Sequence, residues 1–274
     1  MFKQLLLFWV CVLIINTAQS QTPIPYTLHW GHESIYTAYS LAGLATIYSL
    51  NKQIEGHSLE EIQSLNSATI WRIDRNTIHK YSEQKAHISD YVVGTACIVS
   101  VGGAGLIALQ AAHDKQSFIK HAGTLAILWA ETNAVTMITT NIAKSSVRRT
   151  RPYVYNSEVT METKMEKDSR KSFFSGHTAF SASNCFFAAQ VVSQYYPKST
   201  ISYASWGLAT LIPASVAYLR VQSGRHFPTD VISGYIIGAA CGILIPYVHT
   251  RGIDNKSNVQ IGMSPQVISV SLAF

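Results

Sequence analysis

Three short blocks of polar residues lie at the ends of apolar runs, and their residue types suit chemistry on an anion. The blocks span Lys144–Pro152 (KSSVRRTRP), Ser175–His177 (SGH) and Arg220–Asp230 (RVQSGRHFPTD). They contain lysine, arginine, histidine and aspartate side chains that we expect to gather at one end of a helical bundle. This combination of cations, imidazoles and one carboxylate suits the transfer of a phosphoryl group.

The cations and the serine-glycine pair supply the groups that hold a phosphate. A phosphate dianion needs several cationic donors, and a planar guanidinium matches two of its oxygens at once. Lys144, Arg151 and Arg220 are the candidate donors. Ser175 and Gly176 precede a predicted helix, so their backbone amides and the helix dipole are expected to point at the same anion.

Two histidines in one site permit a division of labour. One imidazole can attack phosphorus while the other protonates the leaving oxygen. A carboxylate near a histidine fixes its tautomer and stabilises the positive charge that it acquires. Asp230 follows His226 by four residues and is suited to that task, and His177 is the second histidine.

The three blocks resemble the signature of the type 2 phosphatidic acid phosphatase and vanadium haloperoxidase superfamily. That signature reads Lys-x6-Arg-Pro, then Pro-Ser-Gly-His, then Ser-Arg-x5-His-x3-Asp, and nine key positions match it in order. Two positions depart from it. Phe174 stands where the family usually has proline, and Leu219 stands where it usually has serine. Neither supplies the nucleophile, the acid or a cation.

The resemblance implies a role for each matched residue. His226 is the implied nucleophile that forms a phosphohistidine, and Asp230 orients it. His177 is the implied proton donor to the leaving alcohol, which later activates water. The implied phosphate-binding residues are Lys144, Arg151, Ser175, Gly176 and Arg220. No metal or other cofactor is implied, because fixed cations replace a metal, and the sequence holds no Asp, Glu or His cluster with metal-ligand spacing.

Residues outside the matched positions have simpler interpretations. Arg148 and Arg149 are interpreted as solvated loop charges, and Glu131, inside an apolar run, is expected to pair within the bundle. The other histidines are expected at the surface or in ordinary packing; they are His29, His32, His57, His79, His87, His113, His121 and His249.

Composition indicates which elements position these residues. The chain has 274 residues, of which 47% are hydrophobic and only 13% charged, too few charges for an ordinary soluble enzyme or a disordered chain. The apolar runs with at most one charge are 34–51, 91–113, 121–143, 172–197, 199–219 and 231–250. We predict an all-α helical bundle with about five or six long helices, forming a polytopic membrane protein. A compact helical protein with fully buried central helices is the alternative.

The predicted organisation has four parts. Residues 1–20 have the basic, apolar and small-residue regions of a secretory signal peptide, with an uncleaved anchor as the alternative. Residues 21–87 form an N-terminal region with one apolar helix and an amphipathic polar segment, in which Ser58 and Glu61 have the spacing of a capping box. Residues 88–250 form the bundle, and the short tail 251–274 has the pattern of two strands.

The resemblance implies a metal-independent phosphatase that hydrolyses phosphate monoesters or diphosphates. We expect lipid phosphates as substrates and an inner-membrane location with the site facing the periplasm. The alternatives are a soluble periplasmic acid phosphatase for small phosphate esters and, less favoured, a vanadate-dependent haloperoxidase. The net charge of +6 is compatible with nucleic acid, an anionic membrane surface or a phosphorylated ligand as a partner. The chain lacks the basic stripe or aromatic motif that nucleic-acid binding requires, so we expect a phosphorylated substrate and a membrane but no nucleic acid.

Overall fold

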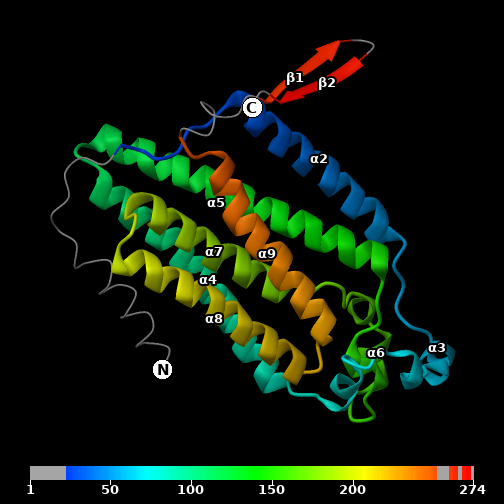
Figure 1. Ribbon diagram of the computed structural model, residues 1–274. Helices are drawn as coiled ribbons and strands as arrows, with labels where there is room; N and C mark the ends of the chain where they lie inside the picture. Colours follow the sequence, from blue (N-terminus) through cyan, green and yellow to red (C-terminus); the bar gives the residue numbers. More distant parts are fainter. Residues whose placement is uncertain (1–22, 252–258, 265–266, 273–274) are drawn as a thin grey trace.

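The structure, a computed structural model, is a bundle of long helices with a cap of short helices at one end (Figure 1). It describes residues 23–251, 259–264 and 267–272. The long helices in this part are α2 (Trp30–Lys52), α4 (Glu83–Ala111), α5 (Lys115–Val147), α7 (Gly176–Tyr195), α8 (Thr200–Gln222) and α9 (Pro228–Val248). Each arises from one of the predicted apolar runs, so the predicted helical bundle is confirmed. The predicted signal peptide lies outside the described residues.

Helix α7 is the central element of the bundle. It packs against α4, α5, α8 and α9 (Figure 1), and it contains no charged Asp, Glu, Lys or Arg. Small and aromatic side chains along it, such as Ala179, Ala182 and Phe187, are fully buried. A helix that carries no charge and is surrounded by others can be buried on every side.

Three glycines allow α9 to approach α7 at backbone distance. Gly234, Gly238 and Gly242 recur every four residues along one face of α9. A Cβ at these positions would collide with the carbonyl oxygens of Ser175, Ala179 and Ser183, respectively. Close backbone approach of this kind is the usual reason for small residues at helix contacts. It fixes the start of α7 against α9, where two of the polar blocks lie.

Helix α2 lies at the side of the bundle and packs mainly against α5 (Figure 1). The segment that precedes it is tied to the end of α9. Tyr26 and Thr250 form an antiparallel bridge, and the Thr27 amide donates to the His249 carbonyl at 2.8 Å. The N-terminal segment is thereby joined to the end of the bundle that is remote from the cap.

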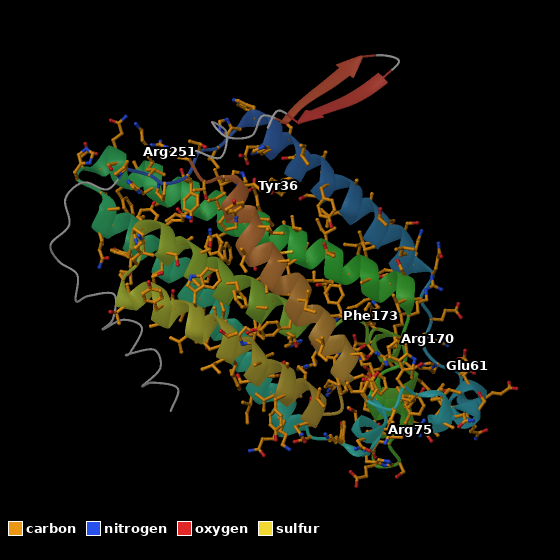
Figure 2. All side chains as sticks on the ribbon, viewed as in Figure 1. Tyr36, Glu61, Arg75, Arg170, Phe173 and Arg251 are labelled. Carbon is orange, nitrogen blue, oxygen red and sulfur yellow. The ribbon has the colours of Figure 1, made fainter. Side chains whose placement is uncertain are left out.

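The cap is formed by the polar segment before α4 and the loop between α5 and α7. Its short helices are α3 (Leu59–Ser64), η1 (Ser67–Thr69), η2 (Arg75–His79), η3 (Pro152–Tyr155), α6 (Met161–Met165) and η4 (Lys167–Arg170). The predicted capping box of Ser58 and Glu61 is confirmed. Arg170 donates to both carboxylate oxygens of Glu61 at 2.7 and 2.6 Å. Figure 2 labels both residues at the cap end of the bundle.

The C-terminal tail contains the predicted pair of strands. Strands β1 (Val259–Ser264) and β2 (Val267–Leu272) pair in antiparallel register, with Val259 opposite Leu272.

The sides of the bundle expose many large apolar residues. Leu41, Ile98 and Leu211 are each about two-thirds exposed, at 66%, 68% and 68%. Within the described chain, two helices are long and apolar enough to cross a membrane, Glu83–Ala111 and Pro228–Val248. Leu41, Ile98 and Leu211 lie on α2, α4 and α8, respectively, so the exposed apolar side chains occur on several sides of the bundle.

Candidate active site

The structure brings the predicted site residues together where the bundle meets the cap. Lys144 is in the last turn of α5, and Arg151 follows that helix in the loop. The remaining predicted residues come from the start of α7, the end of α8 and the start of α9; they are Ser175, Gly176, His177, Arg220, His226 and Asp230. The three blocks are far apart in the sequence but close together in the structure, because α7 packs against both α8 and α9.

His226 is fully buried and has a defined tautomer. Its Nδ1 lies 2.7 Å from the backbone oxygen of Ser172. A carbonyl oxygen can only accept a hydrogen bond, so Nδ1 carries the proton and Nε2 carries the lone pair. Among the described residues, Nε2 has no hydrogen-bond partner. The arrangement leaves a nucleophilic nitrogen free inside the site.

Cations surround this imidazole and lower its basicity. Burial is the main cause that lowers the pKa of His226 well below its ordinary value, followed by the charges of Arg151, Arg220 and Lys144. The charge of His177 contributes in the same direction. His226 is therefore neutral at neutral pH, the state in which its Nε2 can attack phosphorus.

The start of α7 has the form of an anion site. Ser175 is the N-cap, and its hydroxyl oxygen accepts from the amide and hydroxyl of Thr178. The ammonium of Lys144 points at this turn, since a Cβ on Gly176 would lie 3.5 Å from its Nζ. Glycine thus keeps the space between the cation and the helix N-terminus open.

Two buried arginines of the site bind carboxylates. Arg151 donates to the Asp168 side chain at 3.0 Å and to its backbone oxygen at 2.9 Å. Arg220 donates to Asp90 at 3.3 Å. Both carboxylates are about half exposed, whereas both guanidinium groups are buried. A phosphate entering the site can replace these carboxylates, because it offers the same oxygen geometry with a greater charge.

His177 also contacts the carboxylate of Asp90. The distance from its Nε2 to Oδ1 of Asp90 is 2.7 Å. The carboxylate accepts, so Nε2 of His177 carries a proton. The Arg220 guanidinium contacts the same Asp90 oxygen. The Nε2 proton of His177 and the Arg220 guanidinium therefore lie close together in the site.

Asp230 reaches His226 through Ser172. Oδ2 of Asp230 accepts from the Ser172 hydroxyl at 2.6 Å and from the Phe227 amide at 2.9 Å, but it lies 3.7 Å from Nδ1 of His226. The direct acceptor of the imidazole proton is the Ser172 carbonyl. Asp230 fixes the residue that carries this carbonyl and places a negative charge close to the ring.

The interpretation of Arg149 as a solvated loop charge is wrong. Its guanidinium donates to Asp230 at 2.5 Å and to Asp74 at 2.7 Å, and it stacks 4.2 Å above the Phe227 ring. Asp74 also accepts from the amide and hydroxyl of Thr229. Arg149 is therefore the link between the cap and the carboxylate behind His226, and its side chain is only a quarter exposed.

Arg148 differs from its neighbour. It donates to the Ser145 backbone at 3.1 Å and to the Gln53 side chain at 3.3 Å, both neutral oxygens. The two adjacent arginines look equivalent in the sequence. The left-handed backbone of Arg148, at φ 50°, ends α5 and turns Arg149 toward the site.

Sequence reasoning missed four residues that build the site: Asp74, Asp90, Arg149 and Ser172. Asp74 and Asp90 belong to a polar segment in which acidic residues are common. Asp74 is completely buried, but no periodic pattern distinguishes it from its exposed neighbours. Ser172 acts through its backbone oxygen, which leaves no sequence signal.

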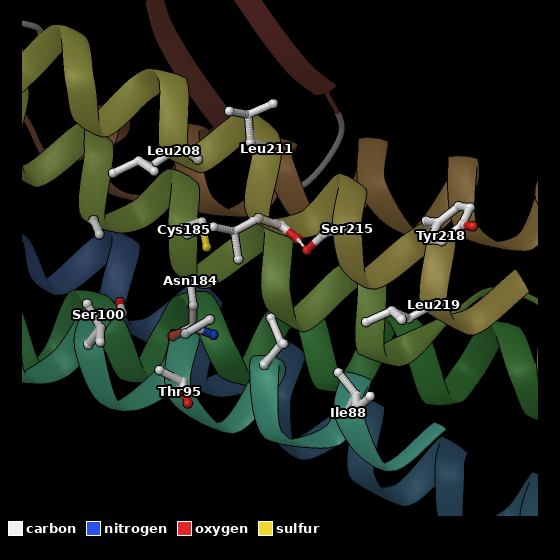
Figure 3. Close-up of a pocket in the computed structure, with 16 residues that line it drawn as sticks. Ile88, Thr95, Ser100, Asn184, Cys185, Leu208, Leu211, Ser215, Tyr218 and Leu219 are labelled. Atoms are coloured by element: carbon white, nitrogen blue, oxygen red, sulfur yellow. Dashed lines mark hydrogen bonds between the residues drawn. The ribbon is translucent and has the colours of Figure 1, made fainter. Parts of the chain in front are cut away.

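A groove of about 540 Å³ begins beside the site and runs between α4 and α8 over α7 (Figure 3). Most of its lining is aliphatic, including Ile88, Ile212 and Leu219. Ile88 and Leu219 directly precede Ser89 and Arg220, which contact each other in the site. Leu219, a departure from the family pattern, thus contributes to the apolar groove, whereas Phe174 is buried.

Residues 125–254 match the family model of the PAP2 superfamily. All three polar blocks lie within this segment. The match agrees with the resemblance that the three blocks indicate, and it supports a phosphatase.

One solved structure that is similar to this chain is that of the first transmembrane PAP2 type phosphatidylglycerolphosphate phosphatase from Bacillus subtilis. The two sequences are 17% identical, and the match covers 81% of this chain and 96% of that chain with a TM-score of 0.46. No curated protein matches the chain.

Proposed function

We propose that this protein is a metal-independent phosphatase of membrane lipid phosphates, which hydrolyses monoesters or diphosphates through a phosphohistidine on His226. The observation that carries the proposal is the buried Nε2 of His226, which has no hydrogen-bond partner in the described chain and lies among cations. A neutral imidazole nitrogen in a cationic pocket is suited to attack a phosphate.

In the first step the lone pair of His226 Nε2 forms a bond to phosphorus, and the bond from phosphorus to the leaving oxygen breaks. For this step His177 must carry protons on both ring nitrogens; it gives the Nε2 proton to that oxygen and becomes neutral, and an alcohol or a phosphate departs. The positive charge that the His226 ring acquires is stabilised by the Ser172 carbonyl and by Asp230. Lys144 and Arg220 neutralise the phosphoryl oxygens in place of a metal.

In the second step water attacks the phosphohistidine. His177, now deprotonated, takes a proton from this water, the bond from phosphorus to Nε2 breaks, and inorganic phosphate is released. His226 returns to its neutral tautomer with the proton still on Nδ1, because the Ser172 carbonyl continues to accept it. The same histidine acts as acid and then as base, as microscopic reversibility requires.

The groove supports a lipid substrate. Along α8 its lining extends from Leu219 to Leu208, eleven residues or about 16 Å of helix. A largely apolar channel that ends at a cationic site fits an amphiphile with a phosphate head and an acyl tail. A small polar ester has no use for this surface.

The exposed surface supports insertion in a membrane. Charged residues of the long helices concentrate in their end turns, and the apolar side chains between them face outward, as Ile98 and Ile236 do. In water such a surface favours association or aggregation, whereas in a bilayer it is solvated by lipid. The predicted signal peptide supports export, with the catalytic end at the periplasmic face of the inner membrane.

Trapping of the phosphoenzyme tests the mechanism. The full chain in detergent is mixed with a radioactive aryl phosphate and quenched within milliseconds. We expect label on the wild-type protein and none on His226→Ala. His177→Ala is expected to lose about 10²–10⁴ in rate with an alkyl phosphate, but to retain much of the first step with an aryl phosphate, whose leaving group needs no proton.

His113→Ala is the matched control, because His113 is half exposed and outside the site; it should behave as wild type. The assignment of roles is wrong if His226→Ala becomes labelled, or if only His177→Ala loses its label. Substrate class is tested separately with detergent-dispersed phosphatidic acid against a short-chain water-soluble ester. Equal kcat/KM for the two would contradict the proposed lipid substrate.

A further inference from the structure

A second polar cluster lies inside the bundle, at the end remote from the cap. It consists of Glu33 in α2, Glu131 in α5 and His249 at the end of α9. One ligand atom from each residue lies within 4.8 Å of the others. Tyr36, which stacks on His249, marks this end in Figure 2, whereas Arg170 and Phe173 mark the catalytic end.

The cluster is separate from the phosphatase site. Glu131 precedes Lys144 by thirteen residues of α5, or about 20 Å. His249 follows Asp230 by nineteen residues, or about 28 Å along α9. The chemistry proposed above uses none of these three side chains.

His249 presents a lone pair to the cluster. Its side chain is completely buried, and its Nδ1 lies 2.8 Å from the backbone oxygen of Ile245. That carbonyl accepts the Nδ1 proton, so Nε2 carries the lone pair and points at the two carboxylates. Among the described residues, Nε2 has no hydrogen-bond partner. Metal-binding histidines are commonly oriented by this kind of contact to a carbonyl.

The two carboxylates add further acceptors. Oε1 of Glu33 lies 3.3 Å from Nε2 of His249, and Oε2 of Glu131 lies 3.7 Å from it. Oε2 of Glu131 is buried and has no hydrogen-bond partner among the described residues. The backbone amide of His29 donates to Glu33 at 3.3 Å. Two carboxylates and one imidazole lone pair thus converge in a largely buried space that requires positive charge.

The neighbouring rings enclose this space. Tyr36 stacks on His249 with centroids 5.8 Å apart, and His32 meets the same ring edge-on at 5.5 Å. Nδ1 of His32 is also buried without a hydrogen-bond partner in the described chain. His32 is not one of the three residues whose ligand atoms lie within 4.8 Å of one another, so it encloses the space rather than adding a fourth ligand.

We propose that Glu33, Glu131 and His249 bind one divalent transition-metal ion, with Zn²⁺ as the best-matched probe. The distances fit such an ion. Two ligands at about 2.05 Å from a tetrahedral Zn²⁺ are about 3.3 Å apart, close to the 3.3 and 3.7 Å from Nε2 of His249 to the two carboxylates. Nitrogen and carboxylate oxygen are the donor types of non-thiolate zinc sites.

A metal at this position joins three elements. Helix α2 packs mainly against α5, and the ion links both to the end of α9. The site is thus structural, and it fastens the peripheral helix to the bundle. Because a bound ion stabilises the folded state that contains its site, zinc is expected to raise the thermal unfolding temperature.

Zinc binding to the purified full chain tests the proposal. The protein in detergent is stripped with a chelator, dialysed against a zinc buffer and analysed for metal by mass spectrometry. We expect about one Zn²⁺ per chain, a rise in unfolding temperature, and a Co²⁺ spectrum with the intense visible bands of four-coordinate sites. Glu33→Gln and Glu131→Gln keep the size of the side chain and its ability to form hydrogen bonds. Each is expected to weaken the affinity for Zn²⁺ by more than 10–100-fold, the loss typical of a residue that only hydrogen-bonds to a metal ligand.

Two controls separate this cluster from adventitious binding. His113→Ala removes a surface histidine beside an aspartate, and Asp90→Asn removes the carboxylate beside His177; both should retain one Zn²⁺ per chain. The two glutamine variants should retain aryl phosphatase activity. The proposal is overturned if the wild type retains no zinc, or if the glutamine variants bind it as tightly as the controls. It is also overturned if zinc leaves the unfolding temperature unchanged.

Discussion

Replacement of Arg149 by leucine tests how the cap supports His226, the proposed nucleophile. Its guanidinium lies between Asp74 and Asp230, whose side chains are completely buried. Removal of one partner from a buried ion pair costs about 3–5 kcal/mol, because a charge remains without compensation. Arg149 is 25% exposed, so water can reach part of the space, and we take the lower end of that range, about 3 kcal/mol.

The assay is thermal unfolding of the full chain in detergent. A loss of about 3 kcal/mol corresponds to a fall of about 6–12 °C in Tm at this chain length. Arg148→Leu is the matched control, because its guanidinium donates to neutral oxygens of Ser145 and Gln53. Removal of Arg148 leaves no buried carboxylate without a partner, and its bond to Gln53 is exposed to water, so the control should lose far less stability.

Activity provides a second measurement. Arg149 touches the carboxylate behind His226 rather than the phosphate-binding cations, so Arg149→Leu should lower kcat and leave KM nearly unchanged. Misplacement of a reacting group by about 1 Å can cost about 10²-fold in rate. Equal changes in Tm for Arg148→Leu and Arg149→Leu would refute this reasoning, as would a loss of activity that appears only in KM.

Three further predictions concern the site and the groove. Arg220→Ala should lower kcat by about 10²–10³ and weaken competitive inhibition by vanadate in parallel; inhibition that does not depend on substrate concentration would contradict a shared pocket. Burial and nearby cations lower the pKa of His226, so its neutral form is retained below pH 6.5, the ordinary imidazole pKa. The decrease of kcat/KM on the acid side of the pH profile should therefore have its midpoint below pH 6.5; a midpoint above 6.5 assigned to His226 would contradict the buried cationic setting. Thr95→Phe should fill the groove and raise KM for a long-chain lipid phosphate but not for a soluble aryl phosphate, with Thr95→Val as the control of equal size; equal effects on both substrates would show that the tail does not use the groove.

The helices could be predicted because their signal is local. Each run with at most one charge became one long helix, and the capping residues Ser58 and Ser175 each precede the first residue of a helix. The meeting of the three polar blocks was also predictable, since each block lies at a helix end and the chain alternates direction between them. The order and spacing of the matched residues carry this information without any knowledge of side-chain contacts.

The partners of those residues could not be predicted, because their signals depend on tertiary contacts. Arg149 differs from Arg148 only through the left-handed turn that separates their directions. Glu33 and His249 are more than two hundred residues apart, so no ligand spacing reveals their contact. A sequence motif can reveal only metal ligands that lie close together in the chain. The ligands of the proposed zinc site lie far apart, so no motif could reveal them.

The glycine contact holds α7 and α9 together, so a movement that admits substrate need not change the distance between His177 and His226. The start of α7 carries the proposed proton donor His177, and the turn before α9 carries the proposed nucleophile His226. The Ser175 amide donates to the Asp230 carbonyl and so joins the two elements. These helices cannot move apart without losing backbone contact along their length. The groove lies between α4 and α8. We expect α4 to move away from α8 when a lipid enters the groove from the side of the bundle. If the proposed lipid substrates bind in this groove, tails of different length and saturation are expected to be admitted while the distance between His226 and His177 stays constant.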